Sequence, residues 1–239
     1  PPPPPPPPTP PPPPPTPPHV CRRQRQMCIR DSIGAGNRIH AHAVIADTPQ
    51  DYSFAGQETW VEIGNDNIIR EGVTIHRGTV QDRHETTIGA HILLMAAVHV
   101  GHDCVIGHHT VLVNNVALAG HVTVGDWAIL SGYTLVHQFC KIGAHSFSGM
   151  GTAIGKDVPA FVTVSGAPAE AKTINMEGLR RRGFSAEAIN DLRRAYKVIY
   201  KQGLTLDIAL QRLESMMSDS PEVRLLIESL HASERGIVR

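Results

Sequence analysis

The chain has 239 residues, and its 22 Lys and Arg balance 22 Asp and Glu, so it has no formal net charge while its 14 His are neutral. This balance argues against a nucleic-acid-binding tail and against a polybasic membrane anchor. No apolar run approaches the roughly 18–20 residues that span a bilayer, and the N-terminus lacks the layout of a signal peptide. The length suits one or two domains. We expect a cytoplasmic protein with no integral membrane span and no nucleic-acid partner.

The cysteine content points to the same compartment. Cys21, Cys28, Cys104 and Cys140 form no C-x-x-C pair, and four cysteines are too few for a disulfide scaffold in a chain of this length. We therefore expect a reducing environment and no structural zinc.

The first 32 residues differ in composition from the rest. Sixteen of the 20 prolines lie in Pro1–Pro18, a run that can form an extended polyproline II rod but cannot bury a core. The following residues, 19–32, are basic and polar without helix or strand periodicity. We interpret residues 1–32 as a low-complexity, disordered extension of non-native origin. The alternative is a proline-rich ligand for an SH3-like domain.

A six-residue repeat follows this extension. From Ile88 an aliphatic residue returns at every sixth position, with one exception at Ser148. The repeat positions are Ile88, Leu94, Val100, Ile106, Leu112, Leu118, Val124, Leu130, Val136, Ile142, Ser148 and Ile154. This period is neither helical nor that of an alternating strand, and it is typical of hexapeptide β-helices. It predicts a left-handed parallel β-helix over residues 33–167, in which three hexads close one triangular coil.

An 18-residue repeat supports three hexads per coil. Ile88-Gly89, Ile106-Gly107, Val124-Gly125 and Ile142-Gly143 recur at this interval. We expect these glycines to form tight corners with unusual backbone angles. The hexad phase also occurs earlier in the chain, and it is interrupted at residues 47–62 and 81–87. These interruptions are expected to form loops that project from the prism.

Helix signals replace the hexads after Pro168. Ser185 is expected to cap a helix with apolar residues at helical spacing and a stop at Gly203. Thr205 and Ser220-Pro221 are expected to begin two more helices. Residues 168–239 are therefore predicted to form a bridging segment and a small C-terminal α-helical domain. Such a domain is too small for a core of its own and should pack on the prism or on neighbouring subunits.

Stacking by 18 residues places four histidines on one face of the predicted prism. They are His99, His102, His121 and His137, and Asp103 follows His102 directly. One interpretation is general-base catalysis by a histidine that a carboxylate orients. A second is a zinc site of three neutral imidazoles, as in γ-type carbonic anhydrases. A third is a non-catalytic β-helix scaffold.

A second histidine column has a simpler pattern. His91, His109 and His145 recur at 18-residue spacing, and Trp127 occupies the remaining position. Because the residues share one position of the coil, we expect a structural stack there.

Five motifs carry a resemblance to a known family. They are Thr74-Ile75-His76-Arg77-Gly78-Thr79, Gly101-His102-Asp103-Cys104, Asn114-Asn115 through Leu118-Ala119-Gly120-His121-Val122, Val136-His137-Gln138-Phe139-Cys140 and the run from Asn175 to Phe184. Residues 33–239 resemble the UDP-N-acetylglucosamine O-acyltransferase family, which takes the first step of lipid A biosynthesis. The resemblance implies transfer of a 3-hydroxyacyl group from acyl carrier protein to the 3-hydroxyl of UDP-N-acetylglucosamine. It also implies a homotrimer, with no metal and no cofactor beyond the phosphopantetheine of the carrier protein.

The resemblance also implies roles for individual residues. His102 is the expected general base, Asp103 its orienting carboxylate and Gly120 the backbone donor of the oxyanion hole, with no covalent intermediate. The expected contacts to the sugar, diphosphate and acyl amide are Gln50, Asp51, His99, His121, His137 and Gln138. The expected contacts to the nucleotide are Asn175, Glu177, Arg181 and Arg182. A basic face with Arg193, Arg194 and Lys197 suits an acidic carrier protein.

The chain departs from the family pattern in three ways. Ser53 replaces a lysine of the loop, which predicts weaker substrate binding rather than lost chemistry. Met150 occupies the position of the acyl-chain ruler, where some members have glycine, and so predicts a donor of about ten carbons. The family also has further coils before the position of Ile33, so we expect a less stable prism than in a longer relative.

The alternative within the superfamily is an N-acyltransferase that acts on the amino sugar later in the same pathway. The run Glu177-Gly178-Leu179 with Arg181-Arg182-Gly183-Phe184 favours the O-acyl enzyme.

Overall fold

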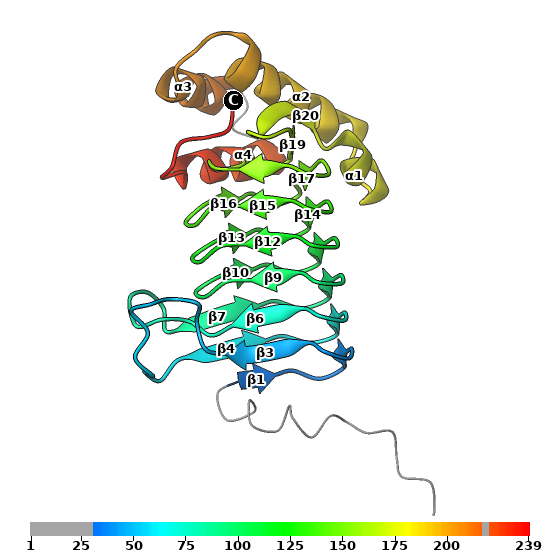
Figure 1. The fold of residues 1–239 in the computed structure, drawn as a ribbon. Helices are drawn as coiled ribbons and strands as arrows, with labels where there is room; N and C mark the ends of the chain where they lie inside the picture. Colours follow the sequence, from blue (N-terminus) through cyan, green and yellow to red (C-terminus); the bar gives the residue numbers. More distant parts are fainter. Residues whose placement is uncertain (1–30, 217–219) are drawn as a thin grey trace, which may run out of the picture.

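The computed structural model describes residues 31–216 and 220–239. The predicted extension, residues 1–32, thus lies outside the described residues except for Asp31 and Ser32, which begin the first strand. Figure 1 shows a column of stacked coils, with β1 at one end and the helices at the other. Within the described residues, no helix has both the length and the apolar character that a membrane span requires.

The prism has three walls, each of them a sheet. Sheet 1 consists of β1 (Asp31–Ile33), β4 (Trp60–Ile63), β7 (Glu85–Ile88), β10 (Val105–Ile106), β13 (Thr123–Val124) and β16 (Lys141–Ile142). Sheet 2 consists of β2 (Arg38–Ile39), β5 (Ile68–Ile69), β8 (Leu93–Leu94), β11 (Val111–Leu112), β14 (Ile129–Leu130), β17 (Phe147–Ser148), β19 (Val162–Ser165) and β20 (Glu170–Ile174). Sheet 3 consists of β3 (Val44–Asp47), β6 (Thr74–His76), β9 (His99–Val100), β12 (Ala117–Leu118), β15 (Leu135–Val136) and β18 (Ala153–Ile154).

The register confirms the predicted 18-residue coil. Ile106 of β10 pairs with Ile88 of β7 and with Val124 of β13, in parallel. The pairings between named strands are parallel except for β20, which runs antiparallel to β19 at the end of sheet 2. The sequence analysis did not predict β20, because its burial alternates along an exposed terminal strand and gives no hexad signal.

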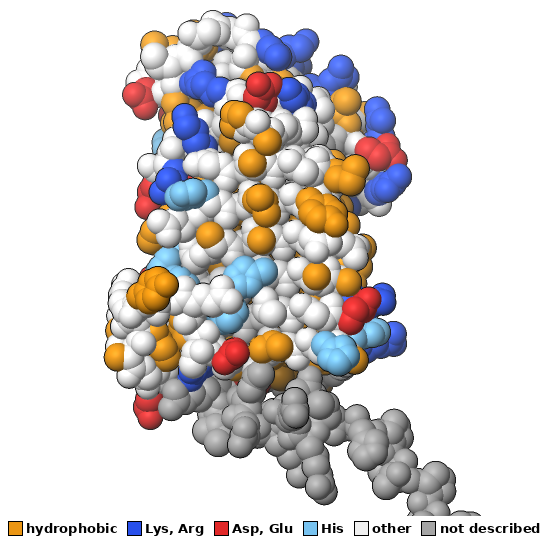
Figure 2. Space-filling view, viewed as in Figure 1, with side chains coloured by type: hydrophobic (Ala, Val, Ile, Leu, Met, Phe, Trp, Pro, Cys, Tyr) orange, Lys and Arg blue, Asp and Glu red, His pale blue; other side chains and the backbone are white. Residues whose placement is uncertain are grey.

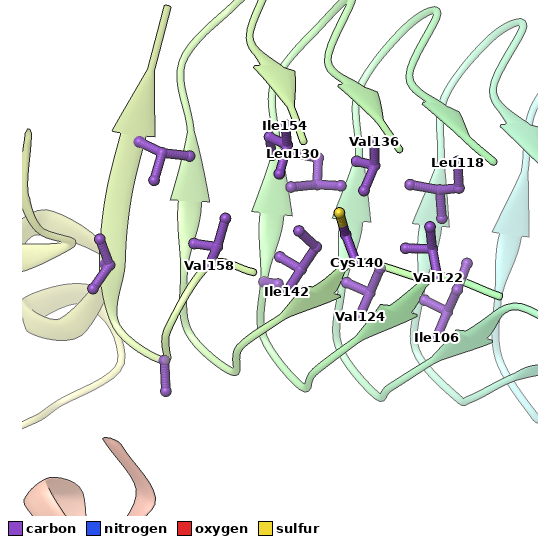
Figure 3. Close-up of a cluster of buried hydrophobic side chains, with 14 of the residues drawn as sticks. Ile106, Leu118, Val122, Val124, Leu130, Val136, Cys140, Ile142, Ile154 and Val158 are labelled. Atoms are coloured by element: carbon purple, nitrogen blue, oxygen red, sulfur yellow. The ribbon is translucent and has the colours of Figure 1, made fainter. Parts of the chain in front are cut away.

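The hexad side chains form the core. Figure 3 shows them pointing from the walls into the interior of the prism, and most are less than 2% exposed. Burial of each aliphatic side chain contributes roughly 1.5–3 kcal/mol. Ser148, the exception in the repeat, is fully buried but satisfied, because its Oγ accepts from the Ser131 amide at 3.0 Å and shares a 2.8 Å hydrogen bond with Thr134 Oγ1.

The corners of the coils correct one expectation. Gly89, Gly107, Gly125 and Gly143 do not adopt the left-handed backbone that we expected of them. They are needed for close approach instead: a Cβ on Gly143 would lie 2.2 Å from the Ala160 amide nitrogen. The left-handed positions follow two residues later and hold side chains with φ between 57° and 61°, namely His91, His109, Trp127 and His145.

Two projecting loops lie along one edge of the prism. They occupy most of the two predicted interruptions, although β4 begins at Trp60 and β7 at Glu85, within those ranges. Figure 1 shows them extending from the same side near β4 and β7. Gln81 Nε2 donates to Ser53 Oγ at 2.6 Å, which joins the two loops. The Arg77 guanidinium carbon lies 5.5 Å from the centroid of the Phe54 ring and holds the first loop against the prism.

The helices cap the prism at the end of the last coils. They are α1 (Met176–Arg181), α2 (Ala186–Lys201), α3 (Leu206–Met216) and α4 (Pro221–His231). The predicted caps at Ser185 and Ser220 are confirmed, since each side chain accepts an amide of the first turn. The short α1 was not predicted, because six residues that include Gly178 give no helical period. Buried Asp157 ties the C-terminal segment to the last coil by accepting from Ser233 Oγ and from the amides of Glu234 and Arg235.

Candidate active site

A buried carboxylate orients His102 at the corner that follows β9. His102 Nδ1 lies 2.8 Å from Asp103 Oδ2, and the Asp103 side chain is fully buried while His102 remains 19% exposed. Because a carboxylate only accepts, His102 Nδ1 must carry a proton, so in the neutral imidazole Nε2 is the nitrogen that has the lone pair. This is the tautomer that a general base requires.

Thr79 holds the carboxylate in turn. Its amide donates to both Asp103 oxygens at 2.8 and 3.0 Å, and its hydroxyl donates to Oδ2 at 2.7 Å. Burial alone would raise the pKa of Asp103, but the hydrogen bonds from His102 and Thr79 outweigh burial and lower it. The pair is thus a fixed anion beside an imidazole. Thr79 lies 24 residues before Asp103, so only the coil register brings them together.

Gly120 has no side chain, and the His102 ring occupies the space where one would lie. A Cβ on Gly120 would lie 2.5 Å from His102 Cε1 and 2.6 Å from Nε2, which excludes any side chain. Among the described residues, no acceptor receives the Gly120 N–H. The Nε2 atom of His102 therefore lies against glycine backbone that has an available donor.

His121 forms a second histidine–carboxylate pair beside the first. Its Nδ1 lies 2.9 Å from Asp82 Oδ2, and its Nε2 lies 3.9 Å from Asp103 Oδ2. The His121 ring meets the His102 ring edge-on at 4.9 Å and stacks on Phe139 at 4.4 Å. Sequence reasoning missed Asp82, which comes from the second projecting loop, 39 residues away from His121.

His99 and His76 form the adjoining wall. His99 Nδ1 shares a 2.8 Å hydrogen bond with Thr74 Oγ1, and the two imidazole rings lie 5.3 Å apart. Burial lowers the pKa of His99, and His76 and His102 lower it further. His76 Nδ1 donates to the Thr48 carbonyl at 2.6 Å, which anchors the loop that bears Gln50 and Asp51. His76 belongs to the motif of residues 74–79, and no role was predicted for it.

A cavity of about 410 Å³ brings part of the predicted set together on sheet 3. Its lining includes Gln50, His76, His99, His102, Gly120 and Gln138, with apolar residues of β12 and β15. Asp51 lies on the first loop, where the Ser53 hydroxyl and amide lower its pKa and the nearby His102 and His121 contribute. His137 is exposed and lines no part of the cavity.

A second cavity of about 690 Å³ holds the residues expected to contact the nucleotide. Asn175, Glu177, Arg181 and Arg182 line it together with His109 and Trp127, over strands β11, β14 and β17 of sheet 2. The two predicted sets therefore lie on different walls of the prism. Met150 is 80% exposed, at the corner between sheets 2 and 3, and lines neither cavity.

Known proteins are similar to this chain in sequence and in fold. Residues 157–238 match the family described as UDP N-acetylglucosamine O-acyltransferase, domain 2. Acyl-[acyl-carrier-protein]–UDP-N-acetylglucosamine O-acyltransferase from Stutzerimonas stutzeri is 63% identical over 87% of this chain and 80% of its own length. The Pseudomonas fluorescens enzyme of the same name is 65% identical over 85% of this chain and 79% of its own. The chain belongs to this acyltransferase family.

Solved structures of the acyltransferase family agree. UDP-N-acetylglucosamine acyltransferase from Bacteroides fragilis superposes with a TM-score of 0.86 at 41% identity, covering 88% of this chain and 82% of its own. The Acinetobacter baumannii relative gives a TM-score of 0.84 at 46% identity, covering 88% and 89% of the two chains. The predicted left-handed parallel β-helix with a small helical domain is confirmed. The relatives are named O-acyltransferases, which favours that family over the N-acyl alternative.

The same residues bear on the zinc alternative. Within the described chain, one group offers three ligand atoms within 4.8 Å of one another, from His102, Asp103 and His121. Both Asp103 oxygens already accept hydrogen bonds, and His102 Nδ1 is one of their donors. A zinc ion bound through Asp103 would have to share these oxygens with the existing hydrogen bonds. The donor set therefore suits an acid–base pair better than a metal centre.

Proposed function

We propose that this chain transfers a 3-hydroxyacyl group from acyl carrier protein to the 3-hydroxyl of UDP-N-acetylglucosamine, with His102 as the general base. The observation that supports it is the His102–Asp103 pair, 2.8 Å apart, beside Gly120 in the sheet 3 cavity. The relatives named for this reaction are more than 60% identical.

The reaction follows from the tautomer of His102. Its Nε2 removes the proton of the sugar 3-hydroxyl as the oxygen attacks the thioester carbonyl. The carbonyl oxygen becomes an oxyanion, and the Gly120 N–H donates to it. When the intermediate collapses, the carbon–sulfur bond breaks and the thiolate of the phosphopantetheine takes the proton back from Nε2. Asp103 stabilises the imidazolium in between, and no covalent enzyme intermediate forms.

We further propose a homotrimer, because the two cavities lie on different walls. In a ring of three prisms, sheet 3 of one subunit faces sheet 2 of the next, and each contact is heterologous. His102 of one chain would then act on a nucleotide held by Arg182 of its neighbour. Mixing His102→Ala chains with Arg182→Ala chains should restore activity in mixed trimers, while each variant alone stays impaired. If each chain instead uses its own two cavities, mixing the two variants would restore no activity.

The carrier protein is proposed to dock on the basic surface of the helical domain. Arg193 and Lys197 of α2 line a small cavity there with Lys201, and Figure 2 shows Lys and Arg side chains gathered over this end of the molecule. Acyl carrier proteins are acidic, so this surface would steer their approach.

Met150 is proposed to limit the acyl chain. It is exposed at a prism corner, so a neighbouring subunit would have to form the other side of an acyl groove. With a panel of 3-hydroxyacyl carrier proteins, we expect the native chain to prefer about ten carbons, and Met150→Gly to shift the preference toward fourteen. An unchanged preference would remove the ruler assignment.

The decisive experiment is an acylation assay with UDP-N-acetylglucosamine and this panel. His102→Ala should lose about 10²–10⁴ in kcat, the usual contribution of general-base catalysis. His91→Ala, an exposed histidine of the other column, is the matched control and should remain active. Activity that survives His102→Ala would favour the scaffold interpretation. Loss of activity with a chelator, restored by zinc, would favour the metal site.

A further inference from the structure

The edge between sheets 1 and 2 holds a column of stacked rings, two of which line the proposed nucleotide cavity. His91, His109, Trp127, His145 and Phe161 occupy equivalent left-handed corner positions. Neighbouring rings stack with centroids 4.1–6.3 Å apart and interplanar angles of 3–15°. The sequence analysis expected only a structural role for this column.

Arg182 contacts two members of the column, Trp127 and His145. Its Nη1 lies 3.1 Å from His145 Nδ1, its Nη2 donates to the Trp127 carbonyl at 2.7 Å, and its guanidinium carbon lies 5.4 Å from the Trp127 ring centroid. A guanidinium only donates hydrogen bonds, so His145 Nδ1 must be an unprotonated acceptor and the ring must be neutral. Burial lowers the pKa of His145 to about 4, and Arg182 contributes, so the ring is neutral near pH 7.

His145 also holds a second residue of the nucleotide set. Its carbonyl accepts from Asn175 Nδ2 at 2.9 Å, while Asn175 Oδ1 accepts from the Gly178 amide at 3.1 Å. These two bonds fix which end of the Asn175 amide points in which direction. Both contacts begin at one corner residue, 30 and 37 positions before the groups they hold.

We propose that His145 is a positioning residue for the nucleotide end of the substrate, holding Arg182 over Trp127 with part of its guanidinium directed to the sheet 2 cavity. Only two of the five N–H donors of Arg182 are used by the described residues, which leaves others for phosphate oxygens. Arg181 is different, because it is exposed and pairs with Glu177 of the same helix. This inference rests on the proposed nucleotide role of Arg182.

Two substitutions separate the ring of His145 from its acceptor atom. His145→Phe keeps an aromatic ring at a corner where Phe161 already takes the same conformation, but it removes the acceptor. His145→Asn keeps an acceptor close to the Nδ1 position, and asparagine tolerates the left-handed backbone. His91→Phe is the control, since His91 belongs to the same column and contacts His109 but not Arg182.

We expect His145→Phe to raise the KM for UDP-N-acetylglucosamine about tenfold, the effect of losing one hydrogen bond to a charged group. Its kcat and its KM for the acyl carrier protein should stay within about twofold. His145→Asn should recover most of the KM, and His91→Phe should leave it unchanged. A merely structural role would instead lower thermal stability and kcat together, with asparagine no better than phenylalanine.

A double-mutant cycle with Arg182→Ala distinguishes the two proposals. If the inference holds, His145→Phe has no further effect on KM once Arg182 is alanine. If Arg182→Ala raises the KM but His145→Phe does not, or if their effects multiply, the positioning role of His145 is wrong. If Arg182→Ala itself leaves the KM unchanged, the proposed nucleotide site is wrong as well.

Discussion

The two histidine columns of this prism use the same backbone corner for opposite purposes. Asp103, His121 and Phe139 repeat at one edge, and Trp127, His145 and Phe161 at another, all in the left-handed conformation. At the first edge carboxylates accept from the Nδ1 atoms of His102 and His121. At the second, Arg182 donates to the Nδ1 atom of His145. The hydrogen-bond partner of Nδ1, rather than the repeat position, therefore decides whether that nitrogen carries a proton.

Apart from loss of His102 itself, the largest effect should come from filling the space at Gly120. Gly120→Ala places a Cβ about 2.5 Å from the His102 ring, so the ring must turn away from its productive orientation. We expect kcat to fall by about 10² or more, because base and oxyanion donor are both disturbed. Gly155→Ala is the matched control, since nothing lies within 4 Å of its added Cβ and its φ is not positive. Equal activity of the two variants would contradict the proposed geometry.

A smaller effect is expected from the second carboxylate of the first column. Asp82→Asn should reduce kcat/KM about fivefold, because the amide replaces a charge-assisted hydrogen bond to His121. Asp66→Asn, an exposed aspartate at another left-handed corner, provides the comparison. If the two variants have the same kcat/KM, Asp82 does not act on the site.

The smallest effect concerns stability rather than activity. The pKa of His145 is about 4 in the folded chain, below the ordinary value of about 6.5. The unfolded chain therefore binds more protons between these values, and stability falls as the pH drops through this window. Arg182 lowers this pKa and Asp126 opposes it. Between pH 7 and pH 5, the Tm of the native chain should fall by a few degrees more than the Tm of His145→Phe. If the two Tm values fall equally, His145 is not the group responsible for the pH dependence.

Much of the fold could be predicted because each hexad specifies its own strand. Leu94, Val100, Ile106 and Leu112 each end a strand and point inward, so local pattern and tertiary packing coincide. The corners were harder to predict. Left-handed positions occupied by His109 or Trp127 have no compositional signal, and the glycines two residues earlier suggested the wrong reason for their presence.

The candidate site was predictable where its partners are adjacent in sequence, as His102 and Asp103 are. It was not predictable where the coil register brings distant residues together. Thr79 meets Asp103 from 24 residues away, Asp82 lies in the second projecting loop, and Arg182 meets His145 only because α1 folds back onto the prism. The last two contacts depend on loop paths that no six-residue pattern encodes.

The position of Trp127 has an optical consequence. Its indole is stacked between His109 and His145 and lies under the Arg182 guanidinium, so its fluorescence should respond when that guanidinium moves toward a phosphate. The chain has two tryptophans, and the other, Trp60, lies in sheet 1. A Trp60→Phe chain would therefore have one emitter, placed beside the proposed nucleotide cavity. Ligand binding in that cavity could then be measured by the fluorescence of Trp127, without turnover and without a labelled ligand.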